Sequence, residues 1–132
     1  MRRGIDLLKN AAKDFELARK YRDAREYITA SILYRKATEK VLRALFIAKR
    51  RKTPPSNATL EYLALQSGLP SGMYEDVVGM PDENMEIAEE ESLLEHDDEE
   101  NTRTAEMEEY RSAVSKHELA RRLIEYARAN VF

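Results

Sequence analysis

The chain has 132 residues, enough for one domain with a single hydrophobic core, and 36% of them are charged. It contains no Cys, which excludes a disulfide framework and a thiolate metal site. No apolar run approaches the roughly 18 residues of a membrane helix, and the N-terminal "MRRGIDLLKN" lacks the apolar core of a signal peptide. We therefore expect a cytoplasmic protein with no membrane association.

Charge is distributed unevenly along the sequence. Residues 1–52 hold 16 Lys/Arg and 6 Asp/Glu, whereas residues 53–132 hold 6 Lys/Arg and 19 Asp/Glu. The net charge of −3 thus conceals a basic half and an acidic half. Either the halves attract each other, within the fold or across a dimer, or the basic half binds a polyanion. Many charged residues and no Cys are also typical of thermophile proteins.

Regularly spaced apolar residues predict a first helix over residues 3–20. The polar stretch 21–23 is expected to form a short turn, with Asp23 placed to cap the next helix. The apolar positions recur at intervals of three and four, the period of one helix face. They are Ile5, Leu8, Ala12, Phe15 and Ala18.

The strongest predicted helix covers residues 24–50. An alanine at every seventh position of its apolar stripe favours close approach of a neighbouring helix. Pro54 and Pro55 then exclude its continuation. The stripe consists of Tyr27, Ala30, Tyr34, Ala37, Val41, Ala44, Leu45 and Ala48.

Beyond the prolines, the sequence predicts a short helix over residues 58–66, capped by Ser56 or Asn57. Gly and Pro residues then indicate an irregular segment, 68–81, whose apolar residues suggest packing on the core.

Two further helices are predicted in the acidic half. Residues 82–100 contain 11 Asp or Glu in 19 positions, with enough apolar residues for one helix face. The final helix, 102–130, carries a narrow apolar seam typical of helical bundles. The seam consists of Tyr110, Ala113, His117, Ala120, Ile124, Ala127 and Val131.

Long amphipathic helices with short connections are typical of a helical bundle. We predict an all-α protein of one domain, residues 1–132. Its expected architecture is an up-and-down four-helix bundle with a short additional helix between the second helix and the acidic helix. The opposite charge of the two halves and the Ala-rich stripe also predict a homodimer.

The motifs of many enzyme and metal-binding families are absent from the sequence. Four Gly in the whole chain argue against a Gly-rich phosphate-binding loop, and no Ser nucleophile motif is present. Neither His follows a Glu by three residues, the spacing of di-metal helical bundles. His96 stands beside Asp97 and Asp98, in a run best interpreted as solvated. We expect no metal and no cofactor.

Arg111 and His117 in the final helix are candidate catalytic residues. A His can move a proton near neutral pH, and an Arg can stabilise negative charge developing on a phosphate, which is the chemistry of a metal-independent ribonuclease. Six positions at about 100° each place the two side chains about 120° apart on an ideal helix. The favoured interpretation of His117 is a half-buried His bonded to a neighbouring helix.

A run of four cations, residues 49–52, ends the second helix, with Arg43 and Lys40 one and two turns before it. The helix dipole favours cations at a C-terminus, which explains the run without a ligand. The alternative is contact with phosphate or nucleic acid. Tyr27 and Tyr34 could stack on a base, although tyrosines on a bundle stripe are typical of a core.

The stretch "YITASILYRKATEKVLRALFIAKRRKTPPSNATLEYLALQSGLP" resembles the HEPN domain family of small α-helical bundles. The family often opens its next short helix with Thr-His, but residues 57–60 read Asn-Ala-Thr-Leu, so the His is missing. The resemblance covers about two thirds of the chain in pattern. The positions that match the family's second helix are Ala37, Glu39, Lys40, Arg43, in place of a Lys, and Ala44.

The resemblance implies a binding role. Many HEPN proteins look like partners of a minimal nucleotidyltransferase in a toxin–antitoxin-like setting, and nucleotide binding has been proposed for the domain. Others look like toxin ribonucleases with Arg, four to six residues, then His in the last long helix. Arg111 and His117 satisfy this spacing, although Ser112 stands where the family usually has Asn or His. Residues 18–46 also resemble a single tetratricopeptide or MIT-type hairpin, but no second repeat follows.

We therefore expect an HEPN-like protein that binds a nucleotide or RNA, or serves as the partner subunit of a nucleotidyltransferase. The alternatives are a metal-independent ribonuclease and a structural helical adaptor without a small ligand. The expected phosphate contacts are Arg35, Lys36, Lys40 and Arg43, with Lys49, Arg50, Arg51 and Lys52 as a diffuse basic patch.

Overall fold

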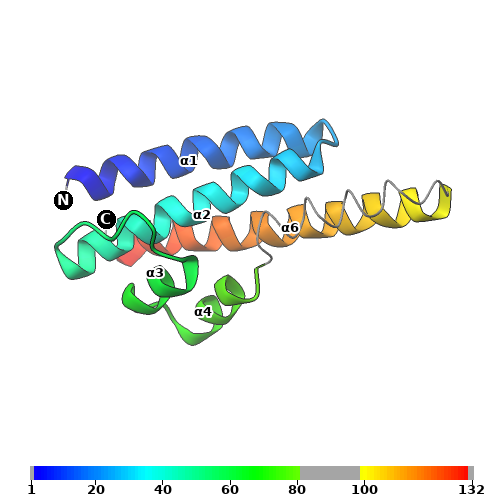
Figure 1. Cartoon of the computed structure of the whole chain (residues 1–132). Coiled ribbons are helices and arrows are strands. Elements are labelled where there is room, and N and C mark those ends of the chain that lie inside the picture. The colour runs from blue at the N-terminus through cyan, green and yellow to red at the C-terminus, as the bar shows by residue number, and fades with distance from the viewer. Residues whose placement is uncertain (1, 81–98, 131–132) are drawn as a thin grey trace.

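The computed structural model describes residues 2–80 and 99–130, which form five helices and no strand (Figure 1). The all-α prediction is confirmed, and the helices pack against one another as a bundle. None of these helices is long and apolar enough to cross a membrane.

Three long helices lie side by side and form the body of the bundle (Figure 1). Helices α1 (Arg2–Asp23) and α2 (Tyr27–Arg50) form an antiparallel hairpin. Helix α6 (Glu99–Asn130) packs along α2 in the same direction, so the C-terminal ends of α2 and α6 lie together with the N-terminus of α1.

Helix α2 is the centre of the core, because α1, α6 and α3 (Leu60–Gln66) all pack against it. Its neighbours supply a compact apolar set that includes Leu8, Leu63 and Leu123. The predicted stripe is confirmed over most of α2, whereas Ile5 on α1 and Tyr110 on α6 are about half exposed. The buried residues of α2 are Ala30, Ser31, Tyr34, Ala37, Thr38, Val41, Leu42, Ala44, Leu45 and Phe46.

The turn between α1 and α2 lies later than the sequence predicts. Helix α1 continues through Asp23, and Arg25 then reverses the chain in the left-handed conformation, with φ 64°. The predicted cap at Asp23 is wrong, because α2 begins after Glu26, whose side chain makes no capping hydrogen bond. Without a Gly or Pro, the sequence gives no signal for this reversal.

Helix α2 ends at Arg50, before the prolines as predicted, and the residue that caps it has an unusual conformation. Arg51 adopts the left-handed conformation, with φ 56°, and its N–H donates to the Ile47 carbonyl at 2.8 Å. This position is usually a glycine, because other residues are strained there. Because of this strain, the fold would be more stable with another residue, such as glycine, at position 51.

The segment after the prolines contains one helix more than predicted. Thr59, rather than Ser56 or Asn57, caps α3, since its hydroxyl accepts from the Tyr62 N–H at 3.1 Å. A short helix, α4 (Ser71–Val78), lies within the segment predicted to be irregular, and its Val77 is buried as part of the core.

The predicted acidic helix falls mainly on residues 81–98, outside the described part of the chain. The four-helix, up-and-down arrangement therefore stays a prediction. Glu99 and Glu100, assigned to the acidic helix from the sequence, belong to α6, which begins three residues before its predicted start.

Candidate functional site

His117 lies in the packed middle of the bundle, in contact with α1 and α2. Its Nδ1 lies 3.0 Å from the hydroxyl of Tyr34, and its ring stacks on Phe15 with centroids 4.8 Å apart. Burial lowers the pKa of His117, with a further contribution from the Arg22 charge, and burial raises the pKa of Tyr34. The His is therefore held neutral near pH 7, as part of an aromatic contact between three helices.

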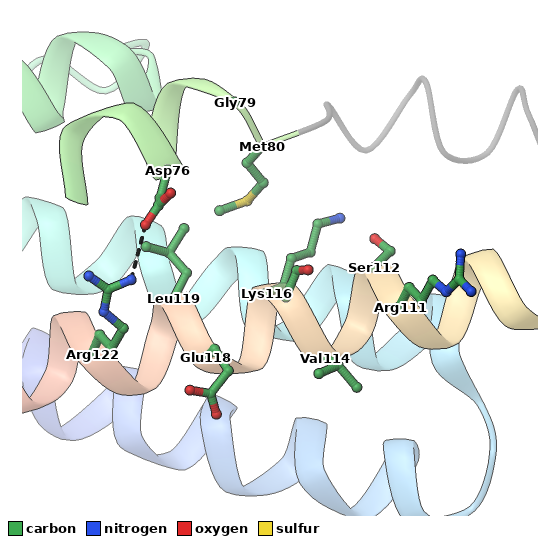
Figure 2. A pocket seen from close by; sticks show the side chains of 11 residues that line it. Asp76, Gly79, Met80, Arg111, Ser112, Val114, Lys116, Glu118, Leu119 and Arg122 are labelled. Carbon is green, nitrogen blue, oxygen red and sulfur yellow. Dashed lines mark hydrogen bonds and ion pairs between the residues drawn. The ribbon is translucent and has the colours of Figure 1, made fainter. Parts of the chain in front are cut away.

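Arg111 occupies a different face of α6. It is exposed and lines a cavity on the side of α4 (Figure 2). His117 instead contacts Phe15 of α1 and Tyr34 of α2. The structure does not bring the two candidate catalytic side chains together within one chain. The ribonuclease alternative stays a prediction, tested by whether His117→Ala abolishes RNA cleavage in EDTA.

The cavity that Arg111 lines has a volume of about 560 Å³ and lies between α6 and the end of α4 (Figure 2). Arg122 forms an ion pair there with Asp76 at 3.0 Å. Lys116 also lines the cavity, but it is only 3% exposed and interacts with other groups of the protein. Met80, on its wall, is the last residue described before the gap at 81–98. Because the cavity is also lined by the carboxylates of Asp76 and Glu118, it is a weaker candidate for a phosphate than a surface of cations alone.

Of the four phosphate contacts expected in the middle of α2, Lys40 and Arg43 form ion pairs inside the fold. Lys40 forms an ion pair with Asp14 of α1, Nζ to Oδ2 2.6 Å, although the groups are not aligned as a hydrogen bond. The Nε atom of Arg35 is buried with no hydrogen-bond partner among the described residues, and Lys36 is exposed.

Arg43 connects the segment after α2 to that helix through hydrogen bonds. Its guanidinium donates to the carbonyls of Pro55 and Ser56 at 3.3 and 3.1 Å and pairs with Glu39 at 3.3 Å. All of these groups belong to α2 or to the turn that follows it, and the Arg43 side chain is only 18% exposed. A structural role therefore accounts for Arg43 without a ligand.

Cations from three helix ends gather at one end of the bundle, which we call the basic end. The N-terminus of α1 meets the chain after α2, where Arg3 donates to the hydroxyl of Thr53 at 2.9 Å. The C-terminus of α6 lies at the same end (Figure 1). The members of the basic end are Arg3, Lys49, Arg50, Arg51, Lys52 and Arg128.

All six residues of the basic end are exposed. None of them forms an ion pair with a carboxylate of the described residues. Arg50 donates to the Gln66 carbonyl at 3.4 Å, and the Lys49 ammonium lies over Gly68. The positive charge of this surface is consequently not neutralised within the described fold.

Sequence reasoning found four of the six cations and missed Arg3 and Arg128. Arg3 adjoins only Arg2, and Arg128 lies between two alanines, so neither belongs to a longer run of cations. Only the topology, which places both chain ends beside the end of α2, reveals them as part of one surface.

Among residues 2–80 and 99–130, no group of three His, Asp or Glu is placed to hold a metal ion.

Comparison with known proteins finds no matching family model, no matching curated protein and no matching solved structure. The HEPN resemblance therefore stays a prediction from the sequence.

Proposed function

We propose that this chain is an HEPN-like binding protein whose basic end binds the phosphates of a nucleotide or of RNA. The observation that supports the proposal is the gathering of six exposed cations, from three helix ends, without carboxylate partners among the described residues. Phosphates are the ligands that such a surface attracts most strongly.

The charge of the whole chain strengthens this interpretation. Residues 81–98 contain nine Asp or Glu and no Lys or Arg. Since the net charge of the whole chain is −3, the other 114 residues together carry +6. The negative net charge thus conceals a cationic remainder that is suited to an anionic ligand.

Helix dipoles alone do not account for so many cations. The C-termini of α2 and α6 each contribute about half a negative charge, and the N-terminus of α1 contributes about half a positive charge. Six cations exceed this balance several-fold. The surplus positive charge favours a ligand over mere compensation of helix ends.

Binding of a fluorescein-labelled RNA of about 20 nucleotides, followed by fluorescence anisotropy over a range of salt concentrations, tests the proposal. Arg51→Glu combined with Lys52→Glu should weaken binding by at least about tenfold. Loss of two phosphate contacts on a single strand should also reduce the slope of log K against log salt by about 1.4. Lys13→Glu combined with Lys20→Glu is the matched control, because it makes the same charge change at exposed positions of α1.

Three outcomes distinguish the hypotheses. A loss confined to the Arg51 and Lys52 variant supports the proposal, whereas equal losses in both variants would show attraction to net charge alone. Absence of binding by the wild type, to RNA and to mononucleotides, would favour the structural adaptor. The nucleotidyltransferase partner and the homodimer stay predictions.

A further inference from the structure

A small cleft opens within the basic end, where the C-termini of α2 and α6 meet the turn between α3 and α4. Its volume is about 250 Å³. Leu45 and Ala48 contribute apolar walls, and Lys49, Tyr126 and Asn130 contribute polar groups. A second hollow at this end, the groove between α1 and the end of α2, is lined by Arg3 and Asn10.

Lys49 is held beside this cleft by the shape of the α3–α4 turn. Gly68 turns the chain with φ 66°, and a Cβ atom at this position would collide with the Lys49 ammonium. The absence of a side chain therefore lets the ammonium lie close against the backbone. No carboxylate of the described residues pairs with it.

Asn130, the last residue of α6, also lines the cleft. Its Nδ2 donates to the Tyr126 carbonyl at 3.0 Å, which fixes the side chain. An amide carries two N–H groups, so one further donor belongs to this side chain. The cleft thus combines one cation and one neutral donor on apolar walls, as phosphate and nucleotide sites commonly do.

We propose that the cleft is a phosphate subsite in which Lys49 and Asn130 hold one phosphate group of the ligand. This inference rests on the proposed function, since it assigns one phosphate of the nucleotide or RNA to a defined place. Whole small-molecule sites measure about 300–1,000 Å³. The cleft is smaller, which fits a phosphate and part of its sugar rather than an entire nucleotide.

A structural role for these cations is the competing explanation. Arg50 donates to the Gln66 carbonyl, and Lys49 lies over the same turn, so both could serve to offset the carbonyls at the end of α3. That role predicts a change in stability when Lys49 is replaced, and no specific change in affinity for phosphate.

Two substitutions of equal charge separate a subsite from general attraction. Asn130→Asp places a carboxylate in the cleft, and Asn10→Asp places one in the neighbouring groove between α1 and the end of α2. We expect Asn130→Asp to weaken RNA binding by about tenfold, the effect of 1.4 kcal/mol. Asn10→Asp should weaken it by less than about threefold, and Lys49→Gln should lose more affinity than Lys20→Gln.

Titration with inorganic phosphate, followed by NMR, locates the contact independently of RNA. The backbone amide of Gly68 and the side-chain amide of Asn130 should shift in the wild type and not in Lys49→Gln. Circular dichroism at each temperature used confirms that every variant is folded. Comparing RNA with and without a 5′-phosphate shows which phosphate of the RNA occupies the cleft. If removal of the 5′-phosphate weakens binding as much as Asn130→Asp does, the cleft holds the terminal phosphate. If its removal leaves the affinity unchanged, the cleft holds an internal phosphodiester.

The possible failures are distinguishable. Equal weakening by Asn130→Asp and Asn10→Asp, with RNA still bound by the wild type, would overturn the subsite and leave the proposed function standing. Absence of RNA and mononucleotide binding would overturn the proposed function, and the phosphate titration would then decide the subsite alone. If phosphate shifts neither the Gly68 amide nor the Asn130 side-chain amide, the subsite is overturned.

Discussion

Two stretches of helix α2 carry similar cations in different surroundings. In its middle, Lys40 pairs with Asp14 and Arg43 binds Glu39 and two carbonyls of the following turn. At and just beyond its end, the basic residues 49–52 are exposed and have no carboxylate partner among the described residues. The same residue types therefore serve the fold in one stretch and face solvent in the other.

The neighbours of α2 explain the difference. Beside its middle, α1 presents a carboxylate, and the returning chain presents carbonyl oxygens. Beside its end, α1 and α6 contribute further cations, Arg3 and Arg128. A cation paired with a carboxylate has a structural role, whereas a cation without a carboxylate partner, among neighbours that are positive too, is a candidate for ligand binding.

Replacing Arg43 is the strongest way to sharpen this comparison. Arg43→Ala removes the hydrogen bonds to Glu39 and to the carbonyls of Pro55 and Ser56. Because hydrogen bonds of charged groups contribute about 1.5–3 kcal/mol, we expect the free energy of unfolding to fall by about 2–3 kcal/mol. Urea denaturation followed by circular dichroism measures this loss.

The control for Arg43 is Lys36→Ala, at an exposed position of the same helix, which should change stability by less than about 0.5 kcal/mol. RNA affinity of the folded Arg43→Ala protein should stay close to that of the wild type. A large loss of affinity with unchanged stability would return Arg43 to the binding surface and break the comparison.

The Tyr34 hydroxyl provides the next largest effect. Tyr34→Phe keeps the ring between Phe15 and His117 but leaves the His117 Nδ1 without its partner at 3.0 Å. We expect a loss of about 1–2 kcal/mol in thermal or urea unfolding. Tyr27→Phe is the control, because the Tyr27 ring contacts Tyr110 at the edge of the bundle and is less buried. Equal effects would show that the hydrogen bond contributes little.

Glycine at Arg51 should separate stability from binding. Arg51→Gly relieves the left-handed conformation at φ 56°, and we expect stability to rise by about 0.5–1 kcal/mol while RNA affinity falls. Arg25→Gly relieves the same conformation, at φ 64°, in the turn at the other end of α2. It should raise stability without loss of affinity. Equal affinities of the two variants would contradict a role for Arg51 in binding.

Much of the fold could be predicted because apolar periodicity is strong in the long helices. Helix α2 was expected to end at Arg50 and does, since the prolines exclude its continuation. The turn at Arg25 and the helix α4 were missed for opposite reasons. Arg25 reverses the chain without a Gly or Pro, and α4 forms within a segment where Gly72 and Gly79 suggest irregular structure.

The site could be predicted only in part, because the role of a cation depends on its neighbours in space. In the sequence, Lys40 and Arg43 look as suitable for phosphate as Lys49 does. What separates them is Asp14, 26 positions away from Lys40, and the carbonyls of a turn whose path the sequence does not specify. His117 shows the same limit, since its contact with Tyr34 joins residues 83 positions apart.

The smallest effect expected is a dependence of stability on pH through His117. Burial lowers its pKa in the folded chain below the ordinary value of 6.5, so the unfolded chain binds more protons at mildly acidic pH. Stability should therefore be full above about pH 6.5 and decline as pH falls toward the lowered pKa. His117→Asn, which does not titrate and retains an amide near the Tyr34 hydroxyl, should show a shallower decline between pH 7 and 5.5 in urea denaturation. Identical slopes for the two proteins would mean that protonation of His117 is tolerated, and that its place between Phe15 and Tyr34 is less enclosed than the packing indicates.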